Sequence, residues 1–322
     1  MEAFIRDAMS RCFGWNARTI REVPGGWSAH ALVVDADAGR YFVKVYDKHR
    51  PTVQGWIARM QENMPVVLWL RDNTLLGERM AAPLLTCNKD YKVENADFLA
   101  LVFPYIEGET LGDAPLTLEQ IRQLAQLLAA LHGSGFRPGA SVEGISETYV
   151  VPFLADIEAY LCARDLPEDV RQILVPHASI LMTAINRLGQ RAEGMRLERP
   201  ACTLCHTDVH GWNLMWDGEA LHLIDWEGLM FAPAEADLFA FSDGFFFDYA
   251  REEFLQTYAA LRPDFALNPQ AMNFYRLRRR VEDIYEFLRG ILADGLGELE
   301  RQKSLAHLRR ECEALAWMEK RG

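Results

Sequence analysis

The stretch from residue 202 to residue 226 constrains this chain more than any other, and it reads CTLCHTDVHGWNLMWDGEALHLIDW. Two short apolar runs in it flank an Asp-Gly pair, which is a strong signal for a tight β-hairpin. A chain that folds back at this turn brings Asn213 and Asp225 to the same end of the ribbon. Asp208 precedes Asn213 by five residues. The stretch therefore predicts that three oxygen-bearing side chains converge.

These three side chains are of the types that phosphoryl transfer from a nucleotide requires. One carboxylate, here Asp208, holds an acceptor hydroxyl and takes its proton, while hard oxygen ligands, here Asn213 and Asp225, hold Mg²⁺. The alternative is that these residues only cap a loop and end a turn. That interpretation is reasonable for each residue alone, but it is much weaker for all three at this spacing.

The composition limits which classes of protein and of binding partner are possible. A chain of 322 residues, 50% hydrophobic and 25% charged, is long enough for one large or two moderate globular domains. A net charge of -12 argues against nucleic acid or an anionic membrane as the partner and is compatible with a cationic small-molecule substrate. Charges interrupt the apolar residues of the N-terminus, and no apolar run approaches the ~20 residues of a membrane helix. We expect a cytoplasmic protein; nothing in the sequence indicates its oligomeric state.

The cysteines do not point to a metal site or to a disulfide framework. Cys202 and Cys205 form a C-x-x-C pair beside His206 and His210, which is a possible zinc pattern. The chain has no second such pair, and this one lies in a strand-like apolar segment where small buried residues are expected. We therefore favour buried thiols over zinc.

A glycine pair lies between two predicted strands at residues 19–23 and 27–34. Gly25 and Gly26, followed by Ser28, allow backbone amides to approach a ligand closely, as a loop covering nucleotide phosphates must. An ordinary tight turn is the alternative interpretation of this segment.

A lysine stands in the middle of the next predicted strand, residues 41–46. Alternation places Lys44 on the same face as Phe42 and Tyr46. Such a lysine either contacts phosphate or protects an edge strand against aggregation. The residue 202–226 stretch favours the phosphate contact.

In His206, Asp208, Asn213 and Asp225, followed by Asp237 in the segment PAEADL, the chain resembles the aminoglycoside phosphotransferase family of kinase-like enzymes. Through HTDVHGWN and IDWE it resembles the spectinomycin-type members most. The resemblance implies an α+β, bilobal, protein-kinase-like fold with Mg²⁺ and ATP or GTP bound between the lobes. We expect a β-rich nucleotide-binding lobe at residues 1–105 and a mostly helical catalytic and substrate-binding lobe at residues 106–322.

The resemblance also implies roles for residues outside the central stretch. Lys44 takes the place of the lysine that holds the α and β phosphates, and Glu62 is the best-placed acid for its usual helix partner, in a helix at residues 54–72 that Pro65 is expected to break. Backbone groups at Phe103, Tyr105 and Ile106 would bind the purine. His206 and Asp237 would steady the catalytic loop.

Acidic residues after the central stretch are candidates for binding an amine-bearing substrate. They are Glu227 and Asp243 within an acidic segment at residues 227–253, and Glu282 and Asp283 on a predicted helix around residues 274–291. A solvated acidic surface explains them equally well.

Three functions remain open from the sequence. The first is phosphorylation of an aminoglycoside or aminocyclitol antibiotic, with resistance as its consequence. The second is a metabolic kinase of the same fold acting on choline, an amino sugar, homoserine or a sugar. The third is a nucleotide-binding regulatory protein without turnover, which the intact set Lys44, Asp208, Asn213 and Asp225 disfavours.

Overall fold

The computed structural model describes residues 1–24, 29–137 and 144–320, so that the predicted phosphate loop at Gly25, Gly26 and Ser28 lies outside the described residues. The chain divides into two compact units. Unit 1 comprises Met1–Ile145 and Asp208–Leu229, and unit 2 comprises Ser146–Thr207 and Met230–Gly322. This division by packing differs from the functional lobes expected at residues 1–105 and 106–322, which stay a prediction.

An antiparallel five-stranded sheet forms the first part of unit 1, with the strand order β1-β2-β3-β5-β4. The strands are β1 (Ala17–Val23), β2 (His30–Ala36), β3 (Gly39–Asp47), β4 (Val93–Glu94) and β5 (Phe98–Pro104). Lys44 of β3 is paired with Ala31 of β2 on one side and with Leu101 of β5 on the other. The edge-strand interpretation of Lys44 is therefore wrong, because β3 has a neighbour on each side.

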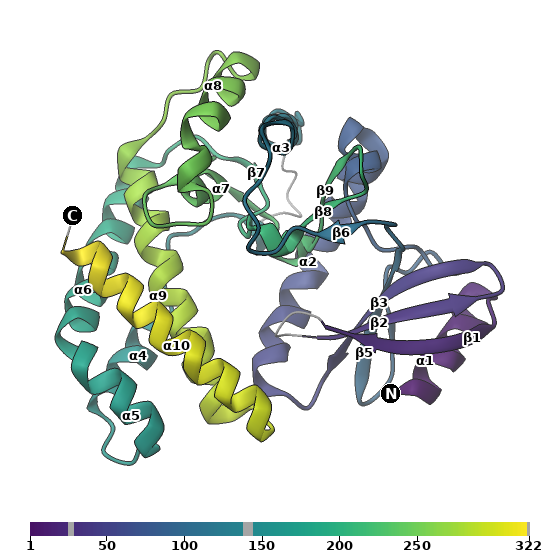
Figure 1. The fold of residues 1–322 in the computed structure, drawn as a ribbon, viewed down its shortest axis with the longest axis horizontal. Coiled ribbons are helices and arrows are strands. Elements are labelled where there is room, and N and C mark those ends of the chain that lie inside the picture. Colours follow the sequence, from purple (N-terminus) through teal and green to yellow (C-terminus); the bar gives the residue numbers. More distant parts are fainter. Residues whose placement is uncertain (25–28, 138–143, 321–322) are drawn as a thin grey trace. The chain divides into compact units, whose positions relative to one another are not determined.

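An N-terminal helix covers one face of this sheet (Figure 1). Helix α1 (Glu2–Ala8) continues into the turn η1 (Met9–Phe13) and ends at Gly14, whose φ of 75° is the left-handed conformation typical of a helix end. Ile5 and Met9 are almost completely buried and join the strand residues of the same hydrophobic cluster. The helix thus closes the core of the sheet.

Helix α2 (Pro51–Asn73) is continuous, so the expected break at Pro65 is wrong. Proline inside a helix costs about 3 kcal/mol because it removes one hydrogen bond and crowds the preceding turn. Pro65 is exposed, whereas its neighbours Met64, Val66 and Val67 are buried. Burial of these side chains offsets the cost, since each contributes roughly 1.5–3 kcal/mol.

The predicted hairpin of the central stretch forms within a second, three-stranded sheet of order β6-β8-β9. The remaining elements of unit 1 are η2 (Leu75–Arg79), β6 (Glu109–Thr110), α3 (Leu118–His132), η5 (Gly211–Asn213), β8 (Leu214–Trp216), β9 (Leu221–Leu223) and η6 (Trp226–Gly228). Helix α3 begins with a capping box, in which Thr117 and Gln120 bind each other's backbone.

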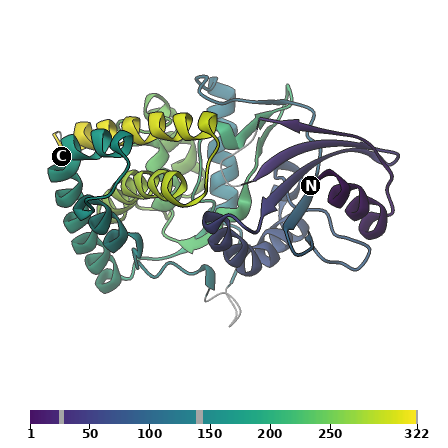
Figure 2. The same cartoon turned by 90° about the horizontal axis from the view of Figure 1, so that it is seen from below.

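Unit 2 is mostly helical. Its elements are α4 (Phe153–Cys162), α5 (Glu168–Leu174), η4 (Val175–His177), α6 (Ala178–Glu198), β7 (Thr203–Cys205), β10 (Met230–Ala232), α7 (Glu235–Leu238), η7 (Phe239–Phe241), η8 (Asp248–Ala250), α8 (Arg251–Leu261), α9 (Pro269–Ala293) and α10 (Glu298–Glu319). Figures 1 and 2 show α9 packed against both α6 and α10. The core residues of α9 recur three and four positions apart, as its sequence predicts: Phe274, Leu277, Val281, Ile284, Leu288 and Ile291.

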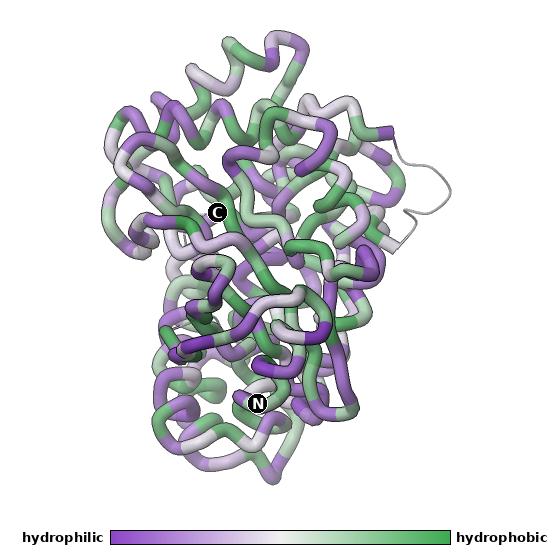
Figure 3. Tube along the Cα trace, turned by 90° about the vertical axis from the view of Figure 1, so that its right-hand side faces the viewer, coloured by the Kyte–Doolittle hydropathy of each residue, from purple (hydrophilic) through white to green (hydrophobic). Residues whose placement is uncertain are grey.

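A strand-rich first part and a helical second part confirm the predicted α+β class. None of the described helices combines the length and the apolar character that crossing a membrane requires. In Figure 3, hydrophobic and hydrophilic stretches alternate along the trace.

We predict that Leu308→Ala in α10 destabilises the protein by about 2–5 kcal/mol, because it removes a completely buried side chain from the core of unit 2. Leu299→Ala in the same helix is the matched control, since that side chain is 70% exposed, and its change should stay within about 0.5 kcal/mol. Urea unfolding of the two variants measures both values. Equal destabilisation by the two substitutions would contradict the packing of α10.

Candidate active site

The β8–β9 hairpin gathers three of the predicted site residues in unit 1. Leu214 pairs with Leu223, and the backbone N–H of Ile224 donates to the carbonyl oxygen of Asn213 at 3.0 Å. Asn213 and Asp225 therefore lie at the same end of the ribbon. Asn213 Nδ2 also donates to Asp208 Oδ2 at 3.0 Å and to the Asp208 carbonyl oxygen at 2.9 Å.

Lys44 joins this group from the centre of the larger sheet. Its Nζ donates to Asp225 Oδ1 at 2.6 Å and to Glu227 Oε1 at 2.9 Å. Tyr46, two residues along β3 and therefore on the same face, donates its hydroxyl to Glu227 Oε1 at 2.7 Å. The predicted strand alternation thus aims both β3 side chains at the turn that follows β9.

The expected pairing of Lys44 with Glu62 is not the one that this structure contains. Glu62 is exposed on α2, whereas the next residue, Asn63, is completely buried and donates Nδ2 to the carbonyl oxygen of Glu227. Neighbouring residues of a helix point about 100° apart, so α2 turns an amide and not a carboxylate toward this turn. Glu227 occupies the position expected of Glu62.

The expectation that Glu227 binds substrate is therefore wrong, because its carboxylate is not available to a ligand. Its side chain is only 5% exposed and is bound by Lys44 and Tyr46. Two further acids of the 227–253 segment, Glu235 and Asp237, are also buried. The interpretation of this segment as one acidic surface is therefore wrong, because its buried members bind groups of the protein itself.

One lysine faces two carboxylates, and this imbalance of charge shifts the pKa values of all three groups. Burial raises the pKa of Asp225, the negative charge of Glu227 raises it further, and Lys44 opposes both, so that it reaches about 7. Burial alone would raise the pKa of Glu227 as well, but the charge of Lys44 and hydrogen bonds to Asp225, Lys44 and Tyr46 lower it to about 2. Burial works against the charged form of Lys44, yet the two carboxylates raise its pKa above the ordinary value.

Asp208 and Asp225 are the partly accessible carboxylates of the group, with 36% and 35% of their side chains exposed, whereas Glu227 is buried. His210 Nε2 lies 3.2 Å from Asp208 Oδ1. The turn that connects His210 to β8 requires a glycine at position 211, since a Cβ there would collide with the carbonyl oxygen of Gly112. On this turn, Trp212 is 59% exposed and its Nε1 donates to Asp113 Oδ1 at 3.1 Å.

The two residues that precede Asp208 in the chain are fixed within unit 2. Asp237 is completely buried, and its carboxylate accepts hydrogen bonds from the backbone N–H groups of His206, at 2.9 Å, and of Thr207. Thr207 has a φ of 72°, a conformation that non-glycine residues adopt only when their surroundings hold them there. The supporting roles of His206 and Asp237 stay a prediction.

The other predicted site residues lie elsewhere in the two units. In unit 1, Phe103 is the buried penultimate residue of β5, and Tyr105 and Ile106 lie half-buried after the end of that strand. In unit 2, Asp243 pairs with Arg251 at 3.2 Å.

The α9 acids are also engaged within unit 2. Glu282 pairs with Arg278 at 3.4 Å, and Asp283 pairs with Arg279 at 2.9 Å. The three acids Asp243, Glu282 and Asp283 thus have arginine partners, and none belongs to the Asp208 group of unit 1.

The donors in unit 1 fit a hard divalent cation. The amide nitrogen of Asn213 is used on Asp208, so its amide oxygen remains as an acceptor. Asp225 and Glu227 supply more negative charge than Lys44 neutralises. Carboxylate and amide oxygens are the ligands that Mg²⁺ takes.

Three residues of this group were not predicted from the sequence as site residues: Tyr46, Asn63 and His210. Strand alternation had already placed Tyr46 on the face of Lys44, which was a usable signal. Asn63 carried no comparable signal, because only the contact between α2 and the turn Trp226–Gly228 gives it a partner.

The fold is that of kinase-like small-molecule phosphotransferases. It is similar to a spectinomycin phosphotransferase, APH(9)-Ia, solved with ADP and spectinomycin, with a TM-score of 0.74 and 19% identity over 98% of this chain and 97% of that chain. It is also similar to a microcompartment-associated aminopropanol kinase, with a TM-score of 0.66 and 15% identity over 99% and 98% of the two chains. For the choline kinase LicA from Streptococcus pneumoniae the TM-score is 0.65, with 17% identity over 98% and 99%.

The sequence comparisons define the family. The profile of the phosphotransferase enzyme family (APH) matches residues 19–275, and the chain therefore belongs to that family. Protein StrN from Streptomyces griseus is 32% identical over 209 residues, which are 60% of this chain and 58% of that protein. The match thus spans less than two thirds of StrN.

We predict that Lys44→Met destabilises the protein by about 3–5 kcal/mol at pH 8, because it leaves the buried carboxylate of Glu227 and the partly exposed one of Asp225 without their cation. Without Lys44 the pKa of Glu227 rises from below to above its unfolded value, and the pKa of Asp225, already raised, rises further, so the folded variant holds protons that the unfolded state releases. The cost should therefore shrink as the pH falls from 8 to 5. Urea unfolding at both pH values measures it, with the exposed Lys303→Met as control. A cost independent of pH would contradict the proposed cause.

Proposed function

We propose that this protein transfers the γ-phosphate of Mg-bound ATP or GTP to a hydroxyl group of a small amine-bearing acceptor. The observation that carries the proposal is the convergence of Lys44, Asp208, Asn213 and Asp225 in unit 1. Family membership supports the same chemistry. Solved relatives of this fold contain ADP or AMP, which supports a nucleotide as the donor.

In the proposed mechanism, Asn213 and Asp225 would hold the metal, and Lys44 would contact the phosphates. Bound Mg²⁺ would neutralise negative charge on the phosphates. Asp208, held by Asn213 and exposed on its other side, orients the acceptor hydroxyl and accepts its proton. The protein contributes mainly positioning and charge neutralisation, since the transition state leaves it little covalent work.

Residues around this group are assigned supporting roles. Glu227 and Tyr46 position Lys44, and Asp237 fixes the backbone at His206 before the catalytic loop. We assign the purine contact to backbone groups at residues 103–106, at the end of the largely buried strand β5 and just after it.

The acceptor is proposed to be an aminoglycoside or aminocyclitol. The spectinomycin enzyme is similar in fold along nearly the whole chain, which supports this class. Trp212 offers an exposed aromatic face beside Asn213 on which a sugar ring or an ammonium group can pack. A metabolic amine kinase is the second candidate, since an aminopropanol kinase and a choline kinase share the fold.

We predict that Asp208→Asn lowers kcat by roughly 10²–10⁴-fold while nucleotide affinity stays within a factor of about two, because the substitution removes the proton acceptor and keeps the shape of the side chain. Product release with Mg²⁺ measures turnover, and calorimetry measures nucleotide affinity. The exposed Asp264→Asn serves as control. Undiminished turnover by the Asp208 variant would remove this residue from its role.

The acceptor class is tested by ADP or GDP release with Mg²⁺ against aminoglycosides, spectinomycin, choline, aminopropanol and simple sugars. We expect turnover with an amine-bearing cyclic acceptor. Turnover with choline or aminopropanol and no antibiotic would establish the metabolic alternative. Tight nucleotide binding without turnover on any acceptor would favour a regulatory protein.

A further inference from the structure

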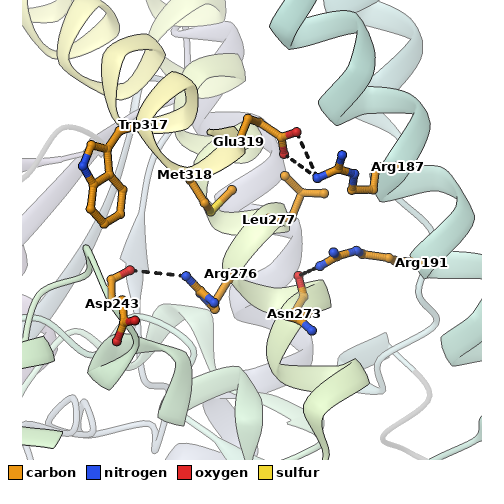
Figure 4. Close-up of a pocket in the computed structure, with 9 residues that line it drawn as sticks. All are labelled: Arg187, Arg191, Asp243, Asn273, Arg276, Leu277, Trp317, Met318 and Glu319. Carbon is orange, nitrogen blue, oxygen red and sulfur yellow. Dashed lines mark hydrogen bonds and ion pairs between the residues drawn. The ribbon is translucent and has the colours of Figure 1, made fainter. Parts of the chain in front are cut away.

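A cavity of about 250 Å³ lies within unit 2. Helices α6, α9 and α10 and the segment before η8 supply its walls (Figure 4). Its lining residues are Arg187, Arg191, Asp243, Asn273, Arg276, Leu277, Trp317, Met318 and Glu319. Three of them are arginines, in a chain whose net charge is -12.

One of these arginines is neutralised by a carboxylate and two are not. Arg187 pairs with Glu319 at 2.9 Å. Arg191 donates to the carbonyl oxygen of Asn273 at 2.6 Å, and Arg276 donates to the carbonyl oxygen of Asp243 at 3.3 Å. Within residues 1–24, 29–137 and 144–320, neither Arg191 nor Arg276 forms an ion pair with a carboxylate.

The surroundings of these two arginines disfavour their positive charge. Burial lowers the pKa of Arg191, and the neighbouring charges of Arg187 and Arg276 lower it further against the opposing effect of Glu319. Burial also lowers the pKa of Arg276, together with Arg251 and Arg280, while Asp243 opposes them. Within the described residues, Arg276 Nε is buried without a hydrogen-bond partner. A buried donor without a partner, and a half-buried charge that neighbouring carboxylates compensate only in part, are both stabilised when an anion binds.

We propose that this cavity binds a small organic anion, whose phosphate or carboxylate group is held by Arg191 and Arg276 and whose carbon skeleton packs against Trp317 and Met318. Guanidinium groups match the planar, forked geometry of both anionic groups and bind them through charge-assisted hydrogen bonds. Leu277, Met318 and the indole of Trp317 supply the apolar part of the wall (Figure 4).

The size of the cavity limits the ligand. At about 30 Å³ for each water molecule, the cavity has room for roughly eight waters or for one compound of similar volume. A monocyclic phosphate ester or carboxylate fits this limit, whereas a nucleoside triphosphate exceeds it. All lining residues belong to unit 2, and none is shared with the Lys44 and Asp208 group of unit 1. The anion site therefore has its own set of residues, different from those of the proposed phosphate and metal site.

The test is calorimetric titration of the full chain with inorganic phosphate, phenyl phosphate and benzoate at constant ionic strength. We expect saturable binding of one molecule per chain for phenyl phosphate or benzoate, and the preferred compound identifies phosphate or carboxylate as the natural anionic group. Arg191→Gln and Arg276→Gln should each weaken this binding by about tenfold or more, because each removes charge-assisted hydrogen bonds. Arg309→Gln, at an exposed arginine of α10, is the matched control and should bind like the unaltered protein.

Trp317→Leu separates the two parts of the proposed site. It should weaken binding of phenyl phosphate and benzoate while leaving inorganic phosphate unaffected. If a glutamine variant does not fold, Arg191→Lys and Arg276→Lys replace it, since they keep the charge, lose the fork and should show the same direction of change. Absence of saturable binding by the unaltered protein, or equal affinity in the unaltered protein and both arginine variants, overturns the proposal.

Discussion

The candidate site depends on the ion cluster that Lys44 forms with the buried Glu227 and the partly exposed Asp225. The cluster joins β3 of the larger sheet to the turn after β9, and Tyr46 and Asn63 attach to the same turn. Breaking such a cluster is costly, because each buried charge loses the partner that compensates its desolvation. The cluster therefore fixes where the end of the ribbon lies within unit 1.

The same cluster carries an excess of negative charge. One ammonium faces two carboxylates, and the pKa of Asp225 rises to about 7 in consequence. A divalent cation at Asn213 and Asp225 would relieve that excess, which gives a physical reason for the proposed metal site. The backbone at Asp225 has a φ of 69°, an uncommon conformation for a residue other than glycine. Strain of this kind persists where surrounding contacts hold it, and it concentrates at functional sites.

The net charge of the chain does not predict the charge at its individual sites. The chain is strongly acidic, yet the cavity among α6, α9 and α10 presents Arg191 and Arg276 without carboxylate partners in the described part of the chain. Conversely, several residues of the acidic 227–253 segment are buried and bind Lys44 or backbone amides. Counting the charged residues in a segment of the sequence therefore predicts neither the sign of the local electrostatic potential nor the exposure of the charged side chains.

The sequence by itself determined the local elements and the chemistry of the central stretch. The Asp-Gly hairpin set which end of the ribbon carries Asn213 and Asp225, strand alternation aligned Lys44 with Tyr46, and helical periodicity located the core face of α9, because each is decided by neighbours a few residues away. Only the tertiary structure decided that Lys44 pairs with Glu227 instead of Glu62, that α2 continues through Pro65, and that arginines of α6 and α9 share a cavity. Those outcomes depend on which faces of distant segments meet, on how much each contact buries and on which charges remain unpaired, and no local pattern encodes these quantities.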